Sequence, residues 1–122
     1  MNYEIEMMKY AKNFKKISVN SKIGIEHKSN ISGELMGSSV YLNSNGFRVE
    51  KNLKFKDKNK NIIMLGDSMT FGWGANKTFS SLLNEKIENF NVFNAGIGNT
   101  NTIMQINNFF ENFSDKFKYD II

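Results

Sequence analysis

The sequence predicts an α/β protein in which helices cover a parallel β-sheet. Two observations in residues 61–122 support this prediction. A short uninterrupted apolar run, Ile62 to Leu65, has the pattern of a strand that is buried on both faces. The apolar spacing of the segments that follow alternates between that of helices and that of strands, which gives the order β-α-β-α-β. This order implies right-handed crossover connections between parallel strands.

Each later element of this unit has its own pattern. The first helix carries apolar residues on one face: Phe79, Leu82, Leu83, Ile87 and Phe90. Residues 91–95 form the second expected strand. Thr102 and Gln105 have the spacing of a capping box at the start of the second helix. That helix has a second apolar face: Ile103, Ile106, Phe110, Phe113 and Phe117.

A third strand is expected over residues 119–122, where the sequence stops. A parallel strand that stops there leaves apolar backbone at a sheet edge. Three strands and two helices also bury little area against the entropy of ordering them. We therefore expect a sheet truncated after its third core strand, and a sequence that is incomplete.

Residues 1–60 have a weaker pattern. Apolar residues at helical spacing predict an amphipathic helix over 3–17: Tyr3, Met7, Tyr10, Phe14 and Ile17. Short β-like runs follow, broken by Gly24, Gly33, Gly37 and an Asn45-Gly46 turn. We therefore divide the chain into an extension with one helix and short strands, residues 1–60, and an α/β unit, residues 61–122.

Composition excludes several classes of protein. Of 122 residues, 40% are hydrophobic and the mean hydropathy is −0.43, which is typical of a soluble globular chain. No apolar stretch approaches the roughly 20 residues that span a bilayer. Glu4 and Glu6 interrupt the region where a signal peptide would be apolar, so we expect a cytoplasmic protein. With no cysteine and one histidine, neither a disulfide nor a zinc site is expected, and no cofactor is predicted.

The positive charge lies in the first half of the chain. Residues 1–60 hold 12 Lys and Arg against 6 Asp and Glu. A cluster of lysines includes positions 51, 54, 56, 58 and 60. Such a run has the charge to bind phosphate groups, but runs of charged residues usually lie on the solvent-exposed surface. We interpret it as surface and expect no nucleic-acid partner.

The segment from Gly66 to Gly74 carries the predicted chemistry. It follows a buried strand and precedes a helix, and in open α/β sheets ligands bind at the carboxyl ends of the strands. Ser68 therefore lies where an exposed nucleophile belongs. Gly66 permits a tight exit from the strand, and Asp67 is suited to orient the turn through hydrogen bonds to backbone. The Ser68 N–H, near a helix start, is suited to stabilise an oxyanion.

The segment GDSMTFGWG, within NIIMLGDSMTFGWGA, resembles the first conserved block of the SGNH (GDSL-type) hydrolase superfamily. The segment NAGIGNTNT, residues 94–102, is similar to the second block, and NSNGFR, residues 43–48, is similar to a segment that precedes the core in some members. The resemblance covers residues 40–122 and is strongest over 61–102. It implies a three-layer α/β/α, flavodoxin-like fold.

The resemblance also implies roles for single residues. Ser68 matches the nucleophile, and its N–H matches one donor of the oxyanion hole. The second donor is a backbone N–H of the second block, at either Gly98 or Asn99; Asn tolerates the positive φ found at such positions. The third block, Gly-x-Asn-Asp, and the last block, Asp-x-x-His, are expected after Ile122. His27, upstream of the first strand, is interpreted as a surface or partly buried structural residue and not as the general base.

Three other residues have alternative interpretations. Phe71 is suited either to line an acyl or sugar pocket or to pack in the core, and we expect it in the core. Trp73 is either a wall of the substrate cleft or part of the core. Arg48 has the charge to pair with Asp67 or with a substrate carboxylate, and the sequence does not choose between these.

The expected function is ester hydrolysis through an acyl-serine, on a small-molecule, carbohydrate or lipid ester. The catalytic domain is incomplete, so the chain alone is expected to have almost no activity, since a serine without its base is a weak nucleophile. Two alternatives stay open. One is a non-catalytic SGNH-like module that binds a partner through its sheet edge. The other is an acyltransferase that uses the same serine.

Overall fold

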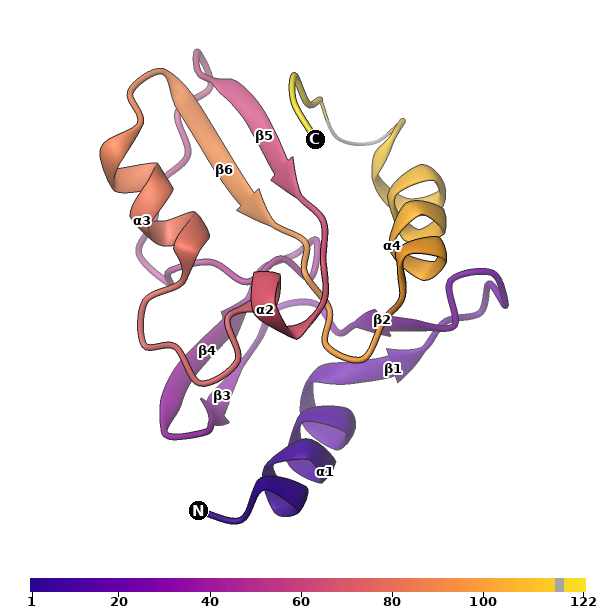
Figure 1. Cartoon of the computed structure of the whole chain (residues 1–122). Helices are drawn as coiled ribbons and strands as arrows, with labels where there is room; N and C mark the ends of the chain where they lie inside the picture. The colour runs from indigo at the N-terminus through magenta and orange to yellow at the C-terminus, as the bar shows by residue number, and fades with distance from the viewer. Residues whose placement is uncertain (116–117) are drawn as a thin grey trace.

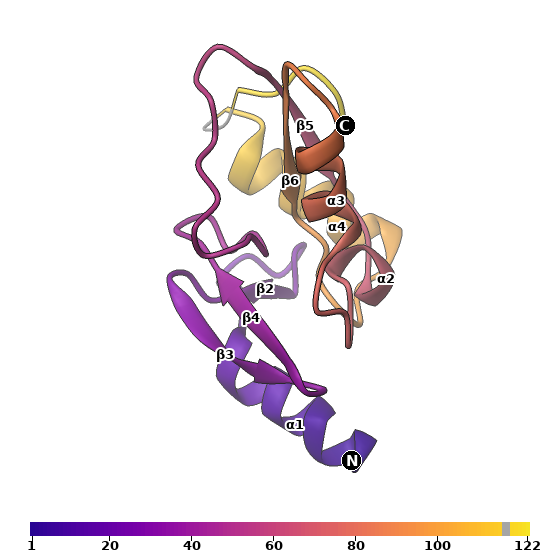
Figure 2. The same cartoon turned by 90° about the vertical axis from the view of Figure 1, so that its left-hand side faces the viewer.

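The chain is a mixed α/β protein, seen in a computed structural model of which we describe residues 1–115 and 118–122 (Figure 1). Helix α1 and the hairpin β3–β4 lie at one end, and the parallel pair β5–β6 lies with its helices at the other (Figure 2). Among the described residues, no helix has both the length and the apolar character needed to cross a membrane.

The first helix is shorter than predicted. Helix α1 spans Tyr3–Phe14, and β1 (Lys15–Ile17) follows it directly and pairs antiparallel with β2 (Ile25–His27). The prediction of a helix over 3–17 was therefore wrong at its end, because Lys15 has an extended backbone and begins a hairpin. Of the predicted apolar face, Tyr10 and Phe14 are buried, whereas Ile17 is 87% exposed.

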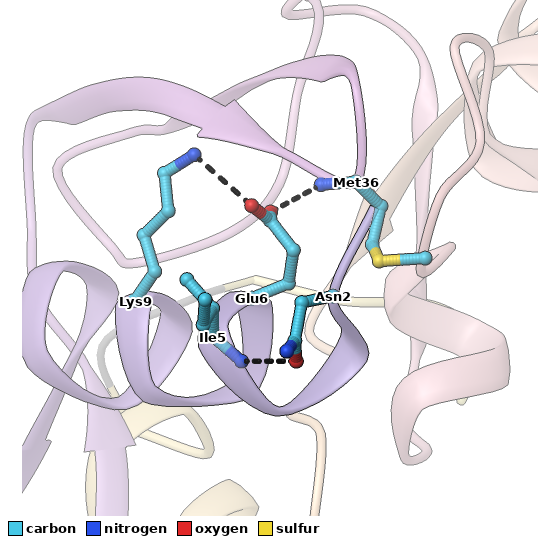
Figure 3. Close-up of polar contacts among 5 residues, drawn as sticks. All are labelled: Asn2, Ile5, Glu6, Lys9 and Met36. Atoms are coloured by element: carbon cyan, nitrogen blue, oxygen red, sulfur yellow. Dashed lines mark hydrogen bonds and ion pairs between the residues drawn. The ribbon is translucent and has the colours of Figure 1, made fainter.

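Glu6 fastens α1 to the hairpin of β3 (Ile31–Leu35) and β4 (Ser38–Leu42). The tight turn of this hairpin has positive φ at both central residues, Met36 and Gly37. The Met36 N–H donates to Glu6 Oε2 at 2.6 Å, and Lys9 Nζ lies 3.4 Å from Glu6 Oε1 (Figure 3). Asn2 caps the helix start by accepting from the N–H groups of Glu4 and Ile5. Helix and hairpin then share one core cluster, which comprises Tyr10, Phe14, Leu35, Val40, Leu42 and Phe71.

The predicted parallel pairing is present. Strand β5 (Lys60–Met64) pairs in parallel with β6 (Phe90–Asn94), with Ile62 opposite Val92. On the other side of β5, Ile121 forms a single parallel bridge with Ile62, where the third strand was expected. Helix α3 (Phe79–Lys86) and helix α4 (Thr102–Asn108) lie on opposite sides of the pair (Figure 1). This confirms a mixed α/β chain with a parallel pair; the complete three-layer sheet stays a prediction.

Helix α3 does not bury the face that its spacing predicts. Ser80 and Ser81 are buried, whereas Phe79 is 61% exposed. The inward serines form a hydroxyl cluster with Thr78, the N-cap, and Ser81 also donates to Glu50 at 2.9 Å. These hydrogen bonds orient the helix with its polar first turn inward.

Helix α4 begins with a different cap and continues differently. Its N-cap is Asn101, which accepts from the Met104 N–H, while Gln105 donates to Thr100 and forms no capping box. The helix continues as a π-helical turn, η1 (Phe109–Phe113), which shifts the buried face. Phe109 is buried, and Phe113 is buried as predicted; the other predicted face residues Ile103, Ile106 and Phe110 are exposed, and Phe117 lies outside the described residues.

Arg48 joins the two ends of the molecule. Its backbone bridges Leu42 at the end of β4 and Asn94 at the end of β6, and its N–H donates to the Asn94 carbonyl at 3.1 Å. The segments that we assigned to 1–60 and 61–122 are thus hydrogen-bonded to each other. The lysines at 51, 54, 56, 58 and 60 are all exposed, as predicted for solvated surface.

Candidate functional site

Ser68 is the first residue of α2 (Ser68–Phe71), the short helix that follows β5 (Figure 1). Asp67 caps this helix, because its Oδ1 accepts from the Met69 N–H at 2.9 Å. Ser68 is half-buried, and within residues 1–115 and 118–122 neither its hydroxyl nor its N–H has a hydrogen-bond partner. The serine therefore presents an oxygen and a helix-terminal N–H side by side.

The two blocks that follow β5 and β6 lie against each other. The Ile97 N–H donates to the Gly66 carbonyl at 3.0 Å. Glycine is required on both sides of this contact, for different reasons. A Cβ on Gly66 would lie 1.9 Å from Thr70 Oγ1 of α2, and one on Gly96 would lie 2.4 Å from the Phe71 nitrogen. Gly66 thus lets α2 pack against the exit of β5, and Gly96 lets the second block approach the backbone that carries Ser68.

Asn94, at the end of β6, fixes this contact from inside. It is 1% exposed; its Oδ1 accepts from the Gly96 N–H at 3.0 Å and its Nδ2 donates to the Thr70 carbonyl at 2.7 Å. In the sequence, Asn94 stood out only as the first residue of the segment that is similar to the second block. The available signal for this role was an amide side chain at the end of a predicted strand.

The structure distinguishes the two candidates for the second donor. The Gly98 N–H donates to Tyr10 Oη at 2.9 Å, so this N–H is already occupied. Asn99 has φ of 61° and is exposed, and no described residue accepts its N–H. Of the two, Asn99 is therefore the residue with an available donor.

His27 is buried at 6% exposure, and the expectation of a surface or partly buried position was wrong. Its Nδ1 lies 3.0 Å from the Gly46 carbonyl, which accepts only, so Nδ1 carries the proton. Nε2 is then the acceptor for the Tyr10 hydroxyl at 2.7 Å. Burial lowers the pKa of His27 to about 4. Both ring nitrogens are thus occupied in a neutral imidazole, which argues against His27 as a base for Ser68.

Lys15 is a member of this site that the sequence analysis missed. It is 8% exposed, and its Nζ donates to the Gly98 carbonyl at 2.9 Å and lies 4.4 Å from the centre of the Tyr10 ring. Burial lowers the pKa of Lys15. Its position within a predicted amphipathic helix gave no signal for this contact, because the contact requires the strand that replaces the end of that helix.

Arg48 pairs with neither Asp67 nor an open cleft. It is 4% exposed, and its guanidinium donates to four backbone carbonyls: those of Ser39, Phe71, Gly72 and Ala75. Burial lowers the pKa of Arg48. Three of the carbonyls follow Ser68, so Arg48 holds the C-terminal end of α2.

The two aromatic residues after Ser68 lie on the core side. Phe71 is fully buried, as predicted, and Trp73 packs against the Tyr10 ring at 5.4 Å between centroids. The Trp73 Nε1 atom is buried and has no hydrogen-bond partner among the described residues. This geometry favours the core interpretation of Trp73 over that of a cleft wall.

Two further features lie outside the serine region. A cavity of about 230 Å³ is lined in part by His27, Ile97 and Asn108, and Ser68 does not contribute to its wall. Within the described part of the chain, no three acidic, histidine or cysteine side chains are placed to hold a metal ion.

No protein-family model matches the chain, and no curated protein matches it significantly.

Proposed function

We propose that the chain provides the nucleophile and two oxyanion donors of a serine ester hydrolase of the SGNH type. One observation carries the proposal: Ser68 begins a helix at the carboxyl end of a parallel strand, with its hydroxyl and N–H unpaired among the described residues, beside a second block with an unpaired N–H at Asn99. Donors placed where negative charge develops are a large source of catalysis in acyl transfer.

The chemistry follows from these groups. Ser68 Oγ forms a bond to the ester carbonyl carbon, and its proton passes to a general base. The carbonyl oxygen becomes an oxyanion that accepts from the N–H groups of Ser68 and Asn99. The carbon–oxygen bond to the alcohol then breaks, and the departing alkoxide takes up a proton. Water finally releases the acid from the acyl-serine.

The general base comes from outside these 122 residues in this proposal. His27 is not suited to the role, since Tyr10 and Gly46 occupy its two nitrogens. Asp67 is not suited either, because its side chain caps α2 and a carboxylate is a weak base for a hydroxyl. An added base therefore gives a direct test.

The test supplies 2-methylimidazole, a base hindered as a nucleophile, with p-nitrophenyl acetate to the full chain. We expect acetylation of Ser68, located by peptide mass spectrometry, at a rate that rises with the concentration of the base. Ser68→Ala should abolish that adduct, and Ser21→Ala, at an exposed turn serine, should leave it unchanged. Equal labelling of Ser68 and Ser21 would contradict the proposal.

A further inference from the structure

A buried cation, Lys15, is hydrogen-bonded to the peptide group that carries the Asn99 N–H. This group joins Gly98 to Asn99, so its carbonyl is that of Gly98, the acceptor of the hydrogen bond from Lys15 Nζ at 2.9 Å. The peptide is trans, as are all those described, and in a trans peptide the C=O and N–H point in opposite directions. Holding the carbonyl against Lys15 therefore aims the Asn99 N–H away from the interior.

The preceding peptide group is fixed as well. It joins Ile97 to Gly98; its carbonyl accepts from Thr100 Oγ1 at 2.6 Å, and its N–H donates to Tyr10 Oη at 2.9 Å. Of the four polar groups in these two peptide units, three have partners and only the Asn99 N–H has none among the described residues. Hydrogen bonds therefore hold both peptide units and leave the Asn99 N–H available to a ligand.

Lys15 also acts through its charge. A cation on a peptide carbonyl withdraws electron density from the amide, and hydrogen bonds to one end of a peptide group strengthen the donor at the other. The Lys15 residue is 8% exposed, so water screens this effect less than it would at the surface. Figure 1 shows the start of β1, which bears Lys15, beside the loop that follows β6.

We infer that Lys15 is a positioning residue for the oxyanion hole: it orients the Gly98–Asn99 peptide and polarises it, so that the Asn99 N–H becomes a stronger donor. The inference rests on the proposed function for its catalytic meaning. It assigns the N-terminal segment a part in the chemistry at Ser68, through backbone rather than through contact with the substrate.

The first measurement needs no activity. Hydrogen exchange of single amides is followed by NMR in the full chain, in Lys15→Met and in Lys16→Met. Lys16 is the matched control, because it lies on the same strand, is exposed and is paired with Glu26 at 3.1 Å. In Lys15→Met we expect base-catalysed exchange of the Asn99 amide to slow by about fourfold or more, as for the loss of a unit charge one peptide away. The Gly98 amide should keep its protection.

A merely structural role has the opposite signature. If Lys15 only held the loop together, its loss would release the Gly98 N–H from Tyr10 and accelerate that exchange. Asn99 exchange that is unchanged, or accelerated exchange at both amides, would overturn the inference. Lys15→Gln, which also removes the charge but keeps a donor, is the second variant in case Lys15→Met does not fold.

The second measurement is the rate of Ser68 acetylation with the added base. We expect about a tenfold fall in Lys15→Met, less than the 10²–10³ that follows removal of a whole oxyanion donor, and no change in Lys16→Met. An unchanged rate in Lys15→Met would overturn the inference. If Ser68 is not acetylated in the unaltered chain, the proposed function fails, and the amide measurement alone then decides whether Lys15 positions this peptide.

Discussion

The loops after β5 and β6 are both held by residues from the first 50 positions, but in different ways. Arg48 holds the loop after β5 by carbonyls that follow Ser68, and the hydroxyl and N–H of Ser68 have no partner among the described residues. Tyr10 and Lys15 hold the loop after β6 by the N–H and the carbonyl of Gly98. The loop after β5 is thus held at residues that follow Ser68, and the loop after β6 is held at Gly98, the residue before Asn99. Rigid support around an unpaired group is what preorganisation requires.

Removing the support of the first loop should have the largest effect. Arg48→Met removes four hydrogen bonds from a buried cation to backbone carbonyls, of which those of Phe71 and Gly72 keep another donor, and we expect a loss of about 3 kcal/mol in the free energy of unfolding. Urea unfolding followed by the fluorescence of Trp73, the only tryptophan, measures it. Lys51→Met, at an exposed position, should change stability little. Equal losses in the two variants would show that Arg48 is not the support described.

The hydrogen bonds that hold the loop after β6 should depend on pH, because Tyr10, which accepts from the Gly98 N–H, is itself hydrogen-bonded to His27. The pKa of His27 falls from 6.5 to about 4 on folding, so the unfolded chain binds the extra proton between these values. Stability is fully present above pH 6.5 and declines as pH falls toward 4, by roughly 3 kcal/mol at most from this residue. Denaturant unfolding across this range should show that decline, and His27→Gln should reduce it. The same decline in both proteins would contradict the assignment.

The contact between the loops is open to a smaller test. Gly96→Ala places a methyl group 2.4 Å from the Phe71 nitrogen, and we expect a loss of about 2 kcal/mol from overpacking, together with slower acetylation of Ser68. Gly74→Ala is the control, since its nearest atom would be 3.7 Å away and only its φ of 74° is unfavourable, for about 1 kcal/mol. A larger loss in Gly74→Ala would refute the close approach.

The smallest effect is expected where α1, which carries Tyr10, meets the β3–β4 turn. The Met36 N–H lowers the pKa of Glu6 below its ordinary 4.5. This contribution is present above pH 4.5 and is lost as pH falls through the folded value. Glu6→Gln should therefore lower the thermal midpoint slightly at pH 7 and by less at pH 3. An equal fall in the midpoint at both pH values would show that packing of the side chain, and not its charge, is responsible.

The sequence allowed the parallel pair and the position of Ser68 to be predicted, because both depend on local signals: an apolar run and a glycine-rich turn. The faces of α3 and α4 could not be predicted. In α3 a hydroxyl cluster at Ser80 and Ser81 overrode the apolar spacing, and in α4 a π-helical turn moved Phe109 inward. The hydrogen bonds of Tyr10 and Lys15 to Gly98 could not be predicted either, because both residues lie more than 80 positions away from Gly98 in sequence.

One side chain decides how this sheet meets other strands. Asn84 of α3 donates through Nδ2 to the Val92 carbonyl and accepts at Oδ1 from the Val92 N–H, both at 2.7 Å. The amide imitates the backbone of a neighbouring strand on the outer margin of β6. An incoming strand, from this chain or another, would find those groups taken there, as in edges that resist aggregation. The margin of β6 at Val92 is therefore closed to a further strand, whereas on the opposite side of the pair β5 is bridged by Ile121.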